Sequence, residues 1–119
     1  MFTAYVVVTV VAVVANGFAA TADFLRAGFV LDTSAGVGVP ESWLTNLGLL
    51  KAAGAAGLLL GLLGVPMIGP AAAAGLVLFF VGALVAHLRA RDFSASLGFP
   101  LAYLLVAAAA LVLGLAVAP

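Results

Sequence analysis

Four long apolar stretches, at about residues 2–22, 44–64, 70–88 and 99–118, constrain this chain of 119 residues more than any other feature. Each has close to the roughly 20 residues that an α-helix needs to cross a hydrocarbon core about 30 Å thick. In lipid the backbone must satisfy its own hydrogen bonds, so stretches of this length are helical even where they are rich in valine. The sequence therefore predicts an all-α, four-helix transmembrane bundle in which residues 1–119 form a single domain.

The composition excludes several classes of protein. Hydrophobic residues make up 67% of the chain and charged residues 7%, against about 25% charged residues in a typical soluble domain, so a monomer soluble in water is excluded. The net charge is zero and the cations are scattered, which argues against nucleic-acid binding. Because the chain has no cysteine and one histidine, we expect no iron–sulfur, zinc or other metal site and no haem.

The segment between the first two stretches, residues 24–42, is the longest connection. Its first half either extends the preceding helix or forms a short helix along the membrane interface, and Pro40 with its neighbours is typical of a helix start. Trp43 and Tyr103 fit the aromatic belt at a membrane surface. Ala20–Ala22 resembles a signal-peptide cleavage site, but no Lys or Arg precedes the apolar run, so we expect a retained first helix.

Glycines in the second stretch are spaced by three and four residues, which keeps them on one side of a helix. Such a row lets another helix approach closely, because packing drives helix association in lipid. The partner of this row is the first stretch, the third stretch or another subunit. The predicted packing residues are Gly54, Gly57, Gly61 and Gly64.

The basic residues indicate how the chain is oriented. With four spans, Arg26, Arg89 and Arg91 lie on one side of the membrane, Lys51 lies just inside that side, and no Lys or Arg lies on the other. Short cytoplasmic loops are enriched in Lys and Arg. We therefore predict that both termini are outside and that residues 23–43 and 89–98 are cytoplasmic.

Polar side chains gather at that same end of the predicted bundle. Asp23 closes the first helix, Lys51 lies about 10 Å into the second at 1.5 Å per residue, His87 closes the third, and Tyr103 opens the fourth. Whether these side chains face one another depends on helix rotations. The candidate ligand-binding residues are Asp23, Lys51, His87, Arg89 and Tyr103; no catalytic residue is assigned.

Each candidate also has a structural interpretation. Lys51 would cost about 2.5–3.5 kcal/mol at the centre of a span, which favours ligand or proton chemistry, but it could instead snorkel to the head groups or pair with Asp23 or Glu41. His87 either switches charge or bonds a quinone-like carbonyl, or belongs to a hydrated helix end. Arg89 either anchors its helix among head groups or binds an anionic ligand.

For other polar side chains the sequence favours purely structural contacts. Asp23 and Arg26 are three residues apart on a helix, which favours a local ion pair. Asn16 lies inside the first apolar stretch, where a hydrogen bond between helices is expected.

The stretch VPESWLTNLGLLKAAGAAGLLLG at residues 39–61 and the ending GALVAHLRARD at residues 82–92 resemble the DoxX-like family of small four-helix bacterial membrane proteins. The resemblance implies a multi-pass protein of the bacterial cytoplasmic membrane with a quinone-linked or redox-accessory role. Without cysteine and with one histidine, the chain would bind a quinone or lipid, or serve another subunit, rather than run thiol or haem chemistry itself.

Three hypotheses of function follow. The first is an accessory subunit that binds a quinone or lipid, with the bilayer and a membrane redox complex as its surroundings. The second is a catalytic quinone-coupled subunit, and the third is a small transporter or the structural subunit of a homo-oligomer.

Overall fold

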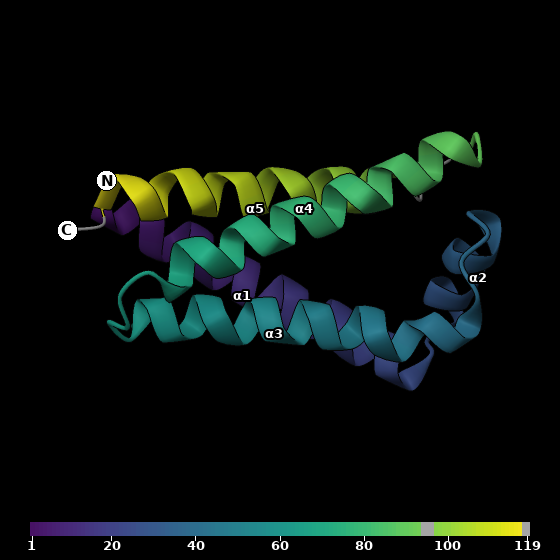
Figure 1. The fold of residues 1–119 in the computed structure, drawn as a ribbon, viewed down its shortest axis with the longest axis horizontal. Coiled ribbons are helices and arrows are strands. Elements are labelled where there is room, and N and C mark those ends of the chain that lie inside the picture. Colours follow the sequence, from purple (N-terminus) through teal and green to yellow (C-terminus); the bar gives the residue numbers. More distant parts are fainter. Residues whose placement is uncertain (94–96, 118–119) are drawn as a thin grey trace.

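The computed structural model describes residues 1–93 and 97–117 and shows an all-α bundle (Figure 1). Four long helices make up most of it: α1 (Phe2–Leu25), α3 (Leu44–Leu62), α4 (Ile68–Arg89) and α5 (Gly98–Val117). Two short elements lie between α1 and α3, namely α2 (Gly28–Gly36) and the 3₁₀ helix η1 (Glu41–Trp43). No strand occurs in the described ranges. The predicted fold class, an all-α bundle of four apolar helices, is confirmed.

The four long helices are long and apolar enough to cross a membrane. Their spans have mean hydropathies of 2.0, 1.3, 2.2 and 2.4 in chain order, the lowest belonging to the span that contains Lys51. Their outward faces carry large apolar side chains, among them Val14, Leu78 and Leu105, which are 66%, 73% and 69% exposed. An apolar surface of this extent belongs in lipid rather than in water, so the chain is a multi-pass membrane protein.

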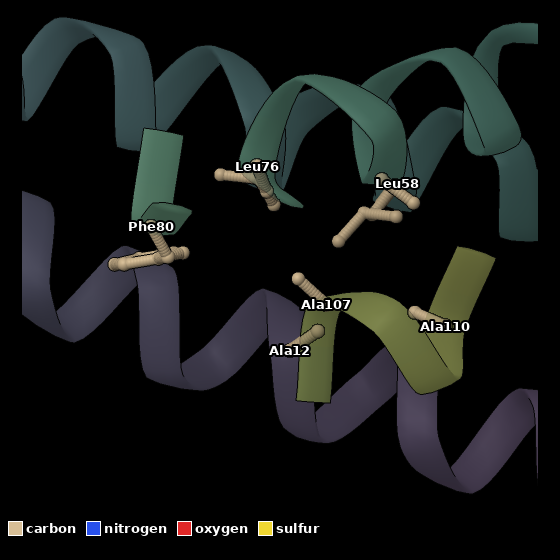
Figure 2. Close-up of a cluster of buried hydrophobic side chains, with 7 residues drawn as sticks. Ala12, Leu58, Leu76, Phe80, Ala107 and Ala110 are labelled. Carbon is tan, nitrogen blue, oxygen red and sulfur yellow. The ribbon is translucent and has the colours of Figure 1, made fainter. Parts of the chain in front are cut away.

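The long helices form a closed ring in which α1 packs against α3 and α5, and α4 packs against the same two helices. Both termini and the α3–α4 turn lie at one end of the bundle, and α2 lies at the other (Figure 1). In the core between them, large side chains of α3 and α4 lie against alanines of α1 and α5 (Figure 2). The buried cluster consists of Ala12, Leu58, Ala73, Leu76, Phe80, Ala107 and Ala110.

The segment at residues 24–42 differs from the expectation. Helix α1 does extend, but only to Leu25, because Arg26 adopts a left-handed conformation with φ 50° and its N–H caps the helix end. A separate helix, α2, then begins at Gly28. The segment thus contains both a short extension of α1 and a separate short helix, divided by the turn at Arg26. That α2 lies along the membrane interface stays a prediction.

The glycine row of α3 faces α4 within the same chain. A Cβ atom built on Gly61 would lie 2.8 Å from the Cα of Gly69, one on Gly57 would lie 2.6 Å from the Cβ of Ala72, and one on Gly54 would lie 2.5 Å from Leu76. Gly64 is outside this contact: it lies in the turn after α3 with φ 100°, and its built Cβ meets nothing within 4 Å. Three of the four glycines thus allow the close approach of α3 and α4.

Candidate functional site

A pocket of about 450 Å³ lies at the end of the bundle away from the termini. The last turns of α1 and α4, the first turns of α3 and α5, and one side of α2 all contribute lining residues. Four of the five candidate residues line it: Asp23, Lys51, His87 and Tyr103. The structure thus brings together polar groups that the sequence placed at similar depth on four different helices.

Asp23 and Lys51 form an ion pair between α1 and α3. The Nζ of Lys51 donates to Oδ2 of Asp23 at 2.8 Å, and the two side chains are only 14% and 3% exposed. The ammonium also lies 5.4 Å from the centre of the Phe79 ring, a distance suited to a cation–π contact. Of the alternatives for Lys51, pairing with Asp23 describes the structure, and snorkelling to the head groups does not.

Arg26 has a different partner from the one expected. Its Nε lies 3.3 Å from Oε1 of Glu41, and one of its terminal nitrogens donates to the Thr45 hydroxyl at 3.4 Å. The local pair between Asp23 and Arg26 is therefore wrong, because the turn at Arg26 directs the guanidinium toward η1 while Asp23 faces α3.

His87 is buried, with 4% of its surface exposed. Its Nδ1 lies 2.9 Å from the carbonyl oxygen of Ala83 one turn earlier, while its Nε2 is buried without a partner among the described residues. The prediction of a hydrated helix end is wrong for this side chain, because its ring bonds back to the preceding turn of α4 and lines the pocket inside the bundle instead of facing water.

Tyr103 bonds within the bundle. Its hydroxyl donates to the carbonyl oxygen of Ala15 in α1 at 3.0 Å, and its ring centre lies 5.2 Å from that of Phe80. The aromatic-belt interpretation is therefore wrong for Tyr103. For Trp43, whose surface is 55% exposed, a place in the aromatic belt stays a prediction.

Replacing Tyr103 with phenylalanine is expected to destabilise the bundle by about 1 kcal/mol, the net contribution of one hydrogen bond. The Ala15 carbonyl lies inside α1 and stays available to the helix, so no buried acceptor is orphaned by the change. Unfolding of the purified protein in mixed detergent micelles, followed by circular dichroism, measures the effect. An unchanged unfolding midpoint would mean that the Tyr103 hydroxyl does not tie α5 to α1.

Sequence reasoning missed the aromatic walls of the pocket. Phe29 of α2 stacks between Phe18 of α1 and Phe99 of α5, with ring centres 6.3 and 6.2 Å apart. On the opposite wall, Phe79 and Phe80 meet edge to face at 5.0 Å. The side chains of Phe18, Phe29 and Phe99 are 62%, 46% and 55% exposed, so this stack is open on one side. Phenylalanine is common in apolar spans, and nothing in its spacing along the sequence indicates that these rings meet.

Arg89 and Asn16 lie outside the pocket. Arg89 is exposed and, with Ala86 and Ala90, lines a separate cavity of about 580 Å³ beside residues 35–38. Asn16 is 2% exposed and its Nδ2 donates to the Ala12 carbonyl in its own helix at 2.9 Å. The expected hydrogen bond between helices is therefore wrong for Asn16, because the preceding turn of α1 supplies the acceptor.

In the part of the chain that the structure describes, no group of three or more His, Cys, Asp or Glu side chains is placed to hold a metal ion. The chemistry that the pocket offers is instead a salt-bridged ammonium, a carboxylate, an imidazole and aromatic faces. Such a site can bind a planar ring that carries polar oxygen atoms.

The model of the family described as the DoxX-like family matches residues 7–110, which include all the residues that line the pocket. No curated protein and no solved structure shows significant similarity to the chain.

Proposed function

The chain belongs to the DoxX-like family, and from this membership and its pocket we propose that it binds the head group of a lipid-soluble quinone as an accessory subunit of a membrane redox system. The observation that carries the proposal is the pocket itself, which combines aromatic walls with polar groups: Lys51 can donate to a ligand oxygen, while Asp23 and His87 add hydrogen-bonding atoms beside it. A quinone head group is a flat ring with oxygen atoms at its edge, so it needs both kinds of surface.

The geometry supports this ligand in three ways. Lys51 has three N–H donors and one of them is used by Asp23, so two remain for a ligand oxygen. Phe29, with its stacking partners, and Phe79 offer ring faces on different helices. The pocket volume of about 450 Å³ is also within the range of about 300–1,000 Å³ usual for small-molecule sites.

The redox-accessory part of the proposal follows from the residue types available. The chain has no cysteine, so a thiol donor of electrons to a bound quinone would have to come from another protein. The proposal places this partner, within a membrane redox complex, at the end of the bundle that contains the pocket. By the distribution of Arg26, Arg89 and Arg91, that end is proposed to be cytoplasmic and the termini outside.

Quinone binding is measurable through Trp43, the only tryptophan of the chain, which also lines the pocket. Titrating a decyl-substituted benzoquinone into the protein in detergent micelles is expected to quench its fluorescence in a saturable way. Gly82→Phe should weaken this binding at least tenfold, because Gly82 lines the pocket and open space surrounds its built Cβ. The new phenylalanine would push the quinone ring away from its stacking and polar contacts, and the loss of these contacts accounts for a tenfold weaker affinity.

Gly75→Phe is the matched control. Gly75 lies two turns earlier on α4, its built Cβ also meets nothing within 4 Å, and it does not line the pocket. The proposal would be overturned by fluorescence quenching that rises linearly with quinone concentration. It would also be overturned if Gly82→Phe and Gly75→Phe weakened quinone binding equally. A saturable change produced by phospholipid and not by quinone would assign the pocket to lipid head groups.

A further inference from the structure

We infer that the pocket discriminates between the two redox forms of its ligand and takes the hydroxyl-bearing hydroquinone in preference to the quinone, with His87 as the specificity-determining residue. This inference rests on the proposed function. It starts from the one buried imidazole nitrogen for which the described residues supply no partner, Nε2 of His87.

The hydrogen bond at the other ring nitrogen decides what Nε2 can do. The carbonyl oxygen of Ala83 is an acceptor only, and it lies 2.9 Å from Nδ1. Nδ1 must therefore carry a hydrogen and donate it. In a neutral imidazole the second nitrogen then has a lone pair and no hydrogen, so Nε2 of His87 is a hydrogen-bond acceptor.

The inference concerns the neutral form of this ring, in which Nε2 offers only its lone pair. His87 is 4% exposed. The carboxylate that lines the same pocket, Asp23, already accepts from Lys51 at 2.8 Å.

A buried acceptor without a partner calls for a donor on the ligand. Buried polar atoms in proteins are nearly always hydrogen-bonded, and a quinone offers only carbonyl oxygens, which would oppose the lone pair of Nε2. A hydroquinone offers O–H groups that can donate to it. Lys51 has free N–H donors that can bond the oxygen of either form, so it does not discriminate and His87 does.

The test compares three ligands that differ only at oxygen: a decyl-substituted benzoquinone, its hydroquinone, and the dimethyl ether of that hydroquinone, which has no O–H. Affinities are measured anaerobically by titration calorimetry in nanodiscs, with empty nanodiscs as the partitioning blank. We expect the hydroquinone to bind about tenfold more tightly than the quinone or the ether, as one additional hydrogen bond provides.

Two variants of His87 should change this ratio by different routes. His87→Phe removes the acceptor, so the hydroquinone should weaken until the ratio is near one. His87→Gln provides an amide that can present either its oxygen or its nitrogen, so the ratio should approach one because the quinone binds more tightly. Each ratio is taken within one variant, so a general loss of stability cancels from it.

The outcomes separate the inference from the proposed function. If all three ligands bind the wild type equally, or if His87→Phe keeps the tenfold ratio, the role of His87 is refuted while quinone binding stands. If neither redox form binds the wild type above the blank, both are refuted.

Discussion

Replacing Lys51 with methionine is expected to destabilise the bundle by about 3–5 kcal/mol, the cost of leaving one member of a buried ion pair without its partner. Methionine keeps the length and apolar stem of lysine, so the change removes the charge and little packing. The Asp23 side chain is only 3% exposed, and water therefore cannot replace the lost ammonium. Unfolding in mixed micelles, followed by circular dichroism, gives the difference in free energy of unfolding.

A double variant identifies the cause of this loss. In Asp23→Leu with Lys51→Met both charges are absent, and apolar pairs of similar volume often match or exceed buried ion pairs in stability. The double variant should therefore be more stable than the single Lys51 variant. As a control, Arg26→Met breaks the pair with Glu41, whose side chains are 36% and 63% exposed, and should cost less than about 1 kcal/mol.

A Lys51→Met protein with wild-type stability would contradict this account. That result is the one expected of a lysine whose ammonium resides among the lipid head groups, where it makes no required contact.

Replacing Gly61 with alanine is expected to destabilise the bundle by about 1–3 kcal/mol through overpacking. The new Cβ would lie 2.8 Å from the Cα of Gly69 and 3.1 Å from its nitrogen. Both atoms belong to the backbone of α4, so no side chain can rotate away and the two helices must move apart. The same unfolding assay measures the change.

Gly75→Ala is the matched control for Gly61→Ala. It adds the same methyl group to α4 at a position where a Cβ meets nothing within 4 Å. Because alanine favours the helix by about 1 kcal/mol over glycine, this variant should be as stable as the wild type or more so. Equal destabilisation by both variants would show that the contact of Gly61 with Gly69 does not set the distance between α3 and α4.

The fold followed from the sequence because a bilayer leaves few alternatives. Runs of about 20 apolar residues must be helices in lipid, which fixes the four spans regardless of detailed side-chain pattern. The depth of Asp23, Lys51, His87 and Tyr103 also followed, since the rise of a helix is constant. Depth sufficed to expect these residues at one end of the bundle.

Helix rotation and the course of residues 26–43 did not follow from the sequence. Whether Lys51 snorkels or pairs depends on which way α3 faces α1, and apolar residues surround both helices, so no amphipathic pattern specifies the angle. The burial of His87 likewise depends on the rotation of α4. Helix α2 reaches the same pocket after a turn at a single left-handed residue, Arg26. Non-glycine residues adopt that conformation uncommonly, so the sequence gives little reason to expect it there.

The contacts between α3 and α4 grow in size from one end of the bundle to the other. Gly61 meets Gly69, Gly57 meets Ala72, Gly54 meets Leu76, and Lys51 lies over Phe79. The two helices accordingly diverge away from their turn, as Figure 1 shows. Helices α3 and α4 form a wedge with its narrow edge at Gly61 and Gly69. These glycines lie about three helical turns from Lys51 and Phe79 at 3.6 residues per turn, so residues outside the pocket set how far apart its α3 and α4 walls stand.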